Sequence, residues 1–100
     1  MEEIGYGYLA WYLIVDYRKN PGAFRLLFLL WENVYKDGNT IRISDVRIKE
    51  WKEDIEYLCA RQYLSIKDGS IVPRESVREI LTKIPKLESY LEEICRIQEL

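Results

Sequence analysis

Histidine is missing altogether from this chain of 100 residues. Its absence excludes the side chain that most often shuttles protons near neutral pH, and also the commonest zinc ligand. The serines therefore have no histidine base, the carboxylates show no spacing that requires a shared site, and no glycine-rich phosphate loop occurs. The sequence predicts neither an enzyme, nor a metal site, nor a cofactor.

Cysteine is scarce, with only Cys59 and Cys95. Both fall on the inner sides of predicted helices, which favours two small buried side chains. A Cys59–Cys95 disulfide, or a bridge between the Cys95 residues of two subunits, stays open, because some hyperthermophiles keep disulfides inside the cell. The many Ile, Glu, Lys and Arg residues are compatible with such a thermophilic source.

Long hydrophobic runs are also missing. The apolar run over residues 8–15 is too short to span a bilayer. Glu2 and Glu3 precede it, and it lacks the basic start and the small-residue cleavage site of a signal peptide. We therefore expect a cytoplasmic protein with no membrane partner.

The charges nearly balance, with 15 basic and 17 acidic residues and a net charge of −2. A dedicated nucleic-acid-binding domain is usually basic, so any contact with DNA would have to come from a local patch. Hydrophobic residues make up 48% of the chain and charged residues 32%, which is enough for one core in a soluble domain. We expect residues 1–100 to form a single domain.

The first half of the chain predicts two helices and a short strand. Residues 4–19 favour a helix that ends before Asn20-Pro21-Gly22. Residues 23–36 give the clearest helix, apolar on most sides and therefore central to the core. Residues 40–43 alternate and are β-branched, which favours a short strand.

The second half predicts helices around a hairpin. Ser44-Asp45 is expected to cap the helical stretch 44–63, which is either one long helix or two joined by a tight turn. Asp68-Gly69 then lies between two β-rich runs and predicts a two-residue hairpin turn. Residues 74–100 carry a helical stripe in which Pro85 either kinks one helix or opens a second. The expected fold class is α+β and mainly helical, with a small β-hairpin and a long C-terminal helix.

The order of these elements resembles the winged helix-turn-helix family of DNA-binding domains. The resemblance covers about residues 23–84, with a core over residues 23–72 of helix, small strand, helical stretch and two-stranded wing, and a helix that follows the wing. It includes Leu58 followed by Tyr63-Leu64 at the start of the wing. One departure stands out, because Ser44 to Lys49 offers too little chain for the first helix of a helix-turn-helix. The resemblance implies that the 44–63 region enters the major groove of double-stranded DNA.

The cations available for such contacts are few. Lys49 and Lys52 of the helical stretch would contact phosphates. Lys67 and Arg74 would flank the wing, and Arg47, which precedes it, would complete a thin basic edge. Residues 44–63 nevertheless carry four cations and five anions, and the carboxylates of Glu53 and Glu56 on the outward face oppose phosphate binding. The alternative is a solvated helix face with the i, i+4 pairs Lys49–Glu53 and Lys52–Glu56.

The stripe of the last element includes Ile84, Leu87, Leu91 and Ile94. It either packs on the core of its own chain or pairs with a second copy, and related winged-helix proteins often dimerise through a terminal helix. The leading hypothesis is a small homodimeric DNA-binding protein that acts as a transcriptional regulator. The alternative is a protein-interaction module on the same scaffold without DNA binding.

Overall fold

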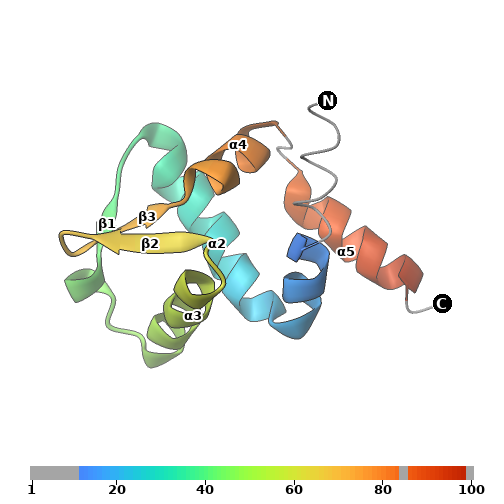
Figure 1. Ribbon diagram of the computed structural model, residues 1–100, viewed down its shortest axis with the longest axis horizontal. Coiled ribbons are helices and arrows are strands. Elements are labelled where there is room, and N and C mark those ends of the chain that lie inside the picture. Colours follow the sequence, from blue (N-terminus) through green and yellow to red (C-terminus); the bar gives the residue numbers. More distant parts are fainter. Residues whose placement is uncertain (1–11, 84–85, 99–100) are drawn as a thin grey trace.

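A computed structural model describes residues 12–83 and 86–98 of the chain (Figure 1). Helices dominate, and one small antiparallel sheet lies at one end, which confirms a mainly helical α+β fold. Residues 12–19 are helical, and residues 4–11 of the predicted first helix lie outside the described residues. In chain order the further elements are α2 (Pro21–Asn33), η1 (Tyr35–Asp37), β1 (Ile41–Arg42), η2 (Ile43–Asp45), α3 (Lys49–Ala60), β2 (Leu64–Lys67), β3 (Ser70–Pro73), α4 (Glu75–Lys83) and α5 (Leu87–Gln98).

Helix α2 is the centre of the core, as its composition predicts. Its buried side chains are those of Ala23, Phe24, Leu26, Leu27, Phe28 and Leu30. The helix begins two residues earlier than predicted, because the Asn20 side chain accepts a hydrogen bond from the Ala23 N–H at 3.2 Å and Pro21 fits the first helical turn. It also ends earlier, at Asn33, and a 3₁₀ turn leads to Gly38, whose φ of 83° favours glycine.

The predicted hairpin is present and belongs to a three-stranded sheet of order β1-β3-β2. Asp68 and Gly69 adopt φ values of 53° and 80°, as a tight two-residue turn requires. Ile71 of β3 pairs with Ile66 and Ile41 on its two sides. Since paired residues share a face, these three isoleucines face the helices. Arg42, Lys67 and Ser70 lie on the opposite face.

The helical stretch 44–63 differs from its prediction, and every residue of it is described. Ser44 and Asp45 belong to the 3₁₀ turn η2 and cap no helix. Residues 46–48 are not helical, and α3 begins at Lys49 with Ile48 at its N-cap. A single 3₁₀ turn therefore stands where a helix-turn-helix would have its first helix. The chain is held there by main-chain hydrogen bonds, from the Ile43 N–H to the Gly69 carbonyl oxygen at 2.9 Å and from the Val46 N–H to the Ile43 carbonyl oxygen at 3.1 Å, and Val46 is buried.

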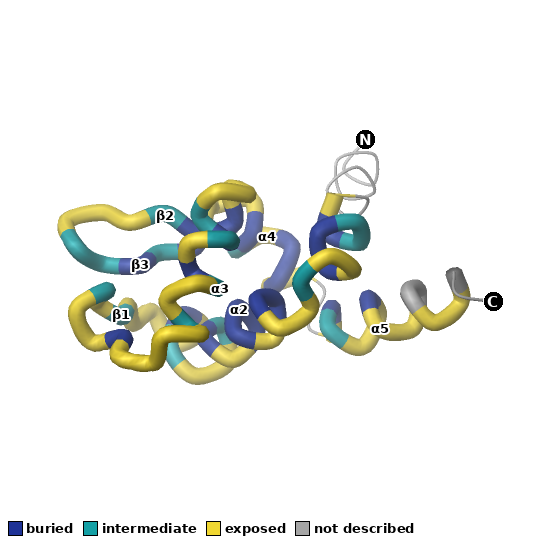
Figure 2. The backbone as a smooth tube through the Cα atoms, turned by 90° about the horizontal axis from the view of Figure 1, so that it is seen from below, coloured by how far each residue is buried: buried dark blue, intermediate teal, exposed yellow. Residues whose placement is uncertain are grey.

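The last element consists of two helices, α4 and α5, rather than one long helix. Buried and exposed positions alternate along both helices (Figure 2). Leu87 and Leu91 are only 2% and 0% exposed in the single chain, so the stripe packs on its own core there. This corrects the expectation that these two leucines face a second copy. Ile84 and the side chain of Ile94 lie outside the described residues.

Candidate nucleic-acid interface

The start of α3 brings three of the predicted DNA-binding residues together. Arg47 lies in the segment that leads into the helix, and Lys49 and Lys52 lie one turn apart on it, all three exposed. Ile48 at the N-cap offers no side-chain hydrogen bond to the first N–H groups of the helix. Uncapped N–H groups and the helix dipole together favour an anion at this end.

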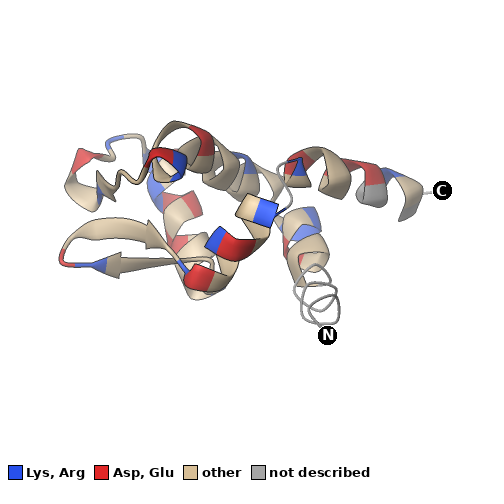
Figure 3. Cartoon of the chain, turned by 90° about the horizontal axis from the view of Figure 1, so that it is seen from above, with Lys and Arg blue, Asp and Glu red and all other residues tan. Residues whose placement is uncertain are grey.

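The ion pairs that would neutralise these lysines are not formed. Neither Lys49 nor Lys52 has a carboxylate within 4.0 Å in the described part of the chain. Glu50 lies in the first turn of α3, and Glu53 and Glu56 follow along the helix, all three exposed. Acidic and basic residues are interspersed over the chain (Figure 3). The start of α3 therefore carries three cations against Glu50, and the turns that follow are negative.

The sheet places two cations near the turn of the hairpin, Lys67 from β2 and Arg42 from the neighbouring strand β1. Lys67 on β2 and Arg42 on β1 both pair with Ser70 of the central strand, so they share the outer face of the sheet, about 10 Å apart. The Arg42 guanidinium extends over the turn, where Nη2 lies 3.4 Å from the Asp68 carbonyl oxygen. Sequence reasoning missed Arg42, because the pairing of β1 with β3 joins residues that are far apart in the sequence and depends on the tertiary fold.

Arg74 is separated from this group. It follows β3 at the end opposite the turn, where its N–H donates to the Tyr63 carbonyl oxygen at 3.1 Å. At a rise of about 3.3 Å per residue, it lies about 13 Å along the strand from Ser70 and the Lys67 position. The structure therefore does not place Arg74 with the other cations of the wing.

A groove of about 530 Å³ lies between α3, the 3₁₀ turn η2 and strand β2 of the hairpin. Its apolar walls come from η2, α3 and β2, and Ile66 remains 49% exposed there. Lys52 and Glu56 form its polar rim. Lys52 of α3 and Ile66 of the hairpin therefore line the same groove. The lining residues are Ile43, Ser44, Lys52, Ile55, Glu56, Cys59 and Ile66.

Cys59 in this groove is a free thiol and only half-buried. Burial raises its pKa, and the nearby Arg74 partly opposes that rise. A thiol whose pKa is raised is mostly protonated near neutral pH and is a poor nucleophile. The side chain of Cys95 lies outside the described residues.

No protein-family model, curated protein or solved structure matches the chain. Its function must therefore be inferred from its own residues. Across residues 12–83 and 86–98, no helix has both the length and the apolar character needed to cross a membrane. The same residues contain no cluster of three or more His, Cys, Asp or Glu side chains suited to a metal ion.

A buried polar cluster holds the far end of α3 in place. The Asp16 carboxylate, 2% exposed, accepts a hydrogen bond from the Tyr63 hydroxyl at 2.6 Å. Its other oxygen, Oδ1, lies 3.0 Å from Nη2 of Arg61, and the Tyr57 hydroxyl donates to the Asp16 main-chain oxygen at 3.2 Å. Burial and the neighbouring Asp16 carboxylate raise the pKa of Tyr57. Sequence reasoning missed this cluster, because Asp16 stands alone in an apolar run.

The turn after α3 positions the side chains of Arg61 and Tyr63 for their contacts with Asp16. The Tyr63 N–H donates to the Leu58 carbonyl oxygen at 2.8 Å and the Gln62 N–H to the Cys59 carbonyl oxygen at 3.1 Å. This pair of bonds is the Schellman motif, which needs a left-handed residue and usually takes glycine there. Here Gln62 adopts a φ of 67°, a strained value for a residue with a side chain.

Proposed function

We propose that this protein binds double-stranded DNA through the N-terminal end of α3 and the tip of the hairpin, as a small transcriptional regulator of winged-helix type. The observation that carries the proposal is the uncapped start of α3, where Arg47, Lys49 and Lys52 are exposed and neither lysine is ion-paired in the described part of the chain. A phosphate oxygen at this end would accept main-chain hydrogen bonds and meet several cations.

The proposed contact differs from the family pattern in one respect. Insertion of the whole outward face of α3 would press Glu53 and Glu56 against phosphates, which costs free energy. Contact by the helix end alone keeps these carboxylates at a distance. Lys67 and Arg42 would then contact a neighbouring stretch of backbone from the hairpin. Such contacts position a protein on DNA but do not read its sequence.

Dimerisation in the cytoplasm completes the proposal. Because Leu87 and Leu91 are buried within the chain, a two-fold contact through α5 would use its exposed apolar residues. Tyr90 and Ile97 are seven positions apart, and two turns of a helix bring such residues to one face. Two copies would present two helix ends to the same duplex.

The test is a titration of random-sequence duplex DNA with the purified protein, followed by fluorescence anisotropy at low and moderate salt. The wild type should bind at low salt and lose affinity steeply as salt rises, because phosphate contacts release counterions. The Lys49→Glu/Lys52→Glu variant should lose most of this affinity. Replacing the same lysines by Gln should lower the slope of log affinity against log salt by about 1.8 for two contacts.

A matched control uses two exposed cations that lie neither on α3 or the sheet nor on α5. The Lys19→Glu/Arg25→Glu variant changes the net charge by the same amount as the α3 variant. It should bind DNA almost as tightly as the wild type. Equal losses in the two double variants would mean that only net charge matters, and no binding at low salt would reject the DNA proposal.

A second candidate function is favoured by the groove between α3 and the hairpin. Its walls expose Ile66 on the helix-facing side of the sheet, and Ile48 is also exposed at the adjoining start of α3. An apolar groove of about 530 Å³ with one lysine and one glutamate at its rim suits the apolar face of an amphipathic helix. In this case the chain is a protein-interaction module, and the partner helix binds in the groove between η2, α3 and β2.

This candidate is tested with a synthetic amphipathic peptide helix and methyl NMR. Binding in the groove should shift the methyl signals of Ile43, Ile55 and Ile66, and Ile66→Asp should abolish the shifts. Ile97→Asp is the control, since Ile97 is exposed on α5 and lines no part of the groove. Shifts that persist in Ile66→Asp would rule the groove out.

A further inference from the structure

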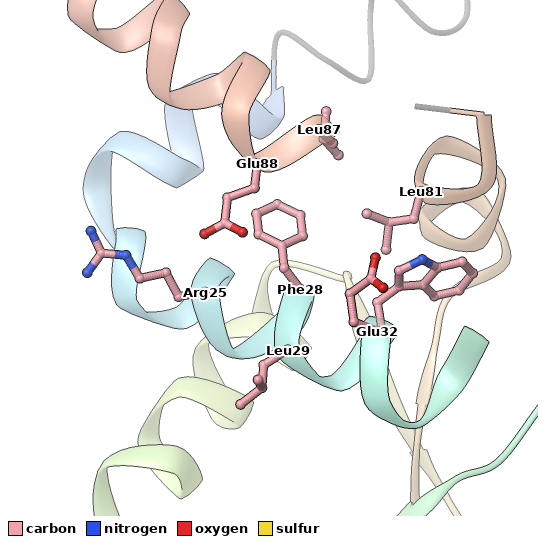
Figure 4. Close-up of a pocket in the computed structure, with 8 residues that line it drawn as sticks. Arg25, Phe28, Leu29, Glu32, Leu81, Leu87 and Glu88 are labelled. Carbon is pink, nitrogen blue, oxygen red and sulfur yellow. The ribbon is translucent and has the colours of Figure 1, made fainter. Parts of the chain in front are cut away.

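A second cavity lies on the other side of the core helix, where α2 meets α4 and α5 (Figure 4). Its volume is about 340 Å³, at the small end of the range for sites that hold small molecules. Phe28, Leu81 and Leu87 form its inner wall and are buried. Trp31 and the half-exposed Leu29 complete its apolar part. The cavity thus offers aromatic and aliphatic contact to a ligand.

The polar groups around this apolar wall carry a net negative charge. Glu32 from α2 and Glu88 from α5 line the cavity together with one cation, Arg25. In Figure 4 the two carboxylates lie on either side of the Phe28 ring, whereas the Arg25 guanidinium points away from that ring at the outer edge. An anion would meet both carboxylates, so the charges select against it.

The two carboxylates are not equally available. Lys36 contacts Glu32 at 3.4 Å, which neutralises part of its charge on the exposed side of α2. Glu88 has no cation within 4.0 Å in the described part of the chain, although Arg25 lines the same cavity. A half-buried carboxylate without a partner beside an aromatic ring is a good receptor for a positive group.

We propose that this cavity binds a small organic cation in which an ammonium group is joined to an apolar body. The apolar body would lie against Phe28, Leu81 and Leu87, and the ammonium would lie between the Phe28 ring and the Glu88 carboxylate. The ring face attracts a cation electrostatically, and the carboxylate adds a charge-assisted hydrogen bond. The cavity includes no residue of α3 or the hairpin, so this site is independent of the proposed DNA contacts.

The experiment compares phenethylamine with 2-phenylethanol. Both share one carbon skeleton, and at neutral pH only the amine carries a charge. Each is titrated into the wild-type protein and followed by NMR at the Trp31 indole N–H and at the Leu81 and Leu87 methyl groups. The amine should bind more tightly than the alcohol by on the order of tenfold, as expected for one desolvated cation–aromatic and carboxylate contact.

Glu88→Gln removes the charge and keeps the shape of the side chain, so it should weaken amine binding on the order of fivefold and leave alcohol binding unchanged. Glu92→Gln is the matched control, since Glu92 lies one turn further along α5, is exposed and does not line the cavity. Equal affinities for the two ligands, equal effects of the two substitutions, or no shifts at millimolar amine would each overturn the proposal. Thermal melts confirm that both variants are folded.

Discussion

The buried contact between Asp16 and Tyr63 gives the sharpest prediction for stability. Tyr63→Phe removes only the hydroxyl and keeps the ring, which packs edge-on against Phe24 at a centroid distance of 5.0 Å. The lost bond is 2.6 Å long and ends on a carboxylate that is 2% exposed. Hydrogen bonds to charged groups contribute about 1.5–3 kcal/mol, and the Asp16 carboxylate keeps its contact with Arg61 at 3.0 Å, which places the loss near the middle of that range.

We therefore expect Tyr63→Phe to lower the free energy of unfolding by about 2 kcal/mol. For a domain of this size, that loss corresponds to a fall of about 8–16 °C in Tm. Urea unfolding followed by tryptophan fluorescence measures the free energy, and circular dichroism measures Tm. Tyr57→Phe is the matched control, because its hydroxyl donates to a neutral main-chain oxygen at 3.2 Å and should contribute only about 1 kcal/mol.

A double-mutant cycle identifies the carboxylate as the cause. In the Asp16→Asn background the acceptor is neutral, so Tyr63→Phe should lower the free energy of unfolding by no more than about 1 kcal/mol. The reasoning is refuted if Tyr63→Phe changes the stability by less than about 0.5 kcal/mol, or if its effect is the same in both backgrounds.

Three further predictions concern other parts of the fold. Burial raises the pKa of Tyr35 to about 12, so the folded chain favours the neutral phenol. The associated stability of about 2–3 kcal/mol should be complete below pH ~10 and lost between pH ~10 and ~12. Urea unfolding at several pH values measures this loss, which Tyr35→Phe should not show. Leu91→Ala should lower the free energy of unfolding by about 2–5 kcal/mol, and the loss should not depend on protein concentration if Leu91 packs within one chain. Gln62→Gly should raise the free energy of unfolding by about 0.5–1 kcal/mol, because glycine adopts the left-handed conformation without strain; an unchanged or lower value in urea would show that the side chain, not the backbone, matters there.

Local patterns predicted the parts of the fold that local chemistry determines. Asp68-Gly69 predicts its turn because few other pairs tolerate positive φ at both positions. The apolar composition of residues 23–36 predicts a buried helix, since no other element could hide so many large side chains. Local patterns did not predict the end of α2 or decide between one C-terminal helix and two, because several residues near each boundary are compatible with either state.

Other features depend on contacts that no local pattern encodes. Ser44 and Asp45 have the right chemistry for a helix cap, yet they lie in a 3₁₀ turn that is hydrogen-bonded to Gly69 through the Ile43 N–H and is followed by the buried Val46. For the candidate site, the sequence identified Arg47, Lys49 and Lys52 as neighbours because they are close along the chain. It could not show that Arg42 joins Lys67 across the sheet, or that Arg74 lies apart.

The Asp16 cluster also has a consequence for the order in which the chain folds. Its hydrogen bonds join positions that are 47 and 41 residues apart, whereas the hairpin and the turns of each helix join near neighbours. Closing such a long loop costs entropy that only the finished contact returns, so we expect the cluster to form after the barrier to folding is crossed. Weakening it should then accelerate unfolding and leave the folding rate almost unchanged. The cluster would therefore contribute to kinetic stability, because it slows the unfolding step in which the helix at residues 12–19 separates from the rest of the domain.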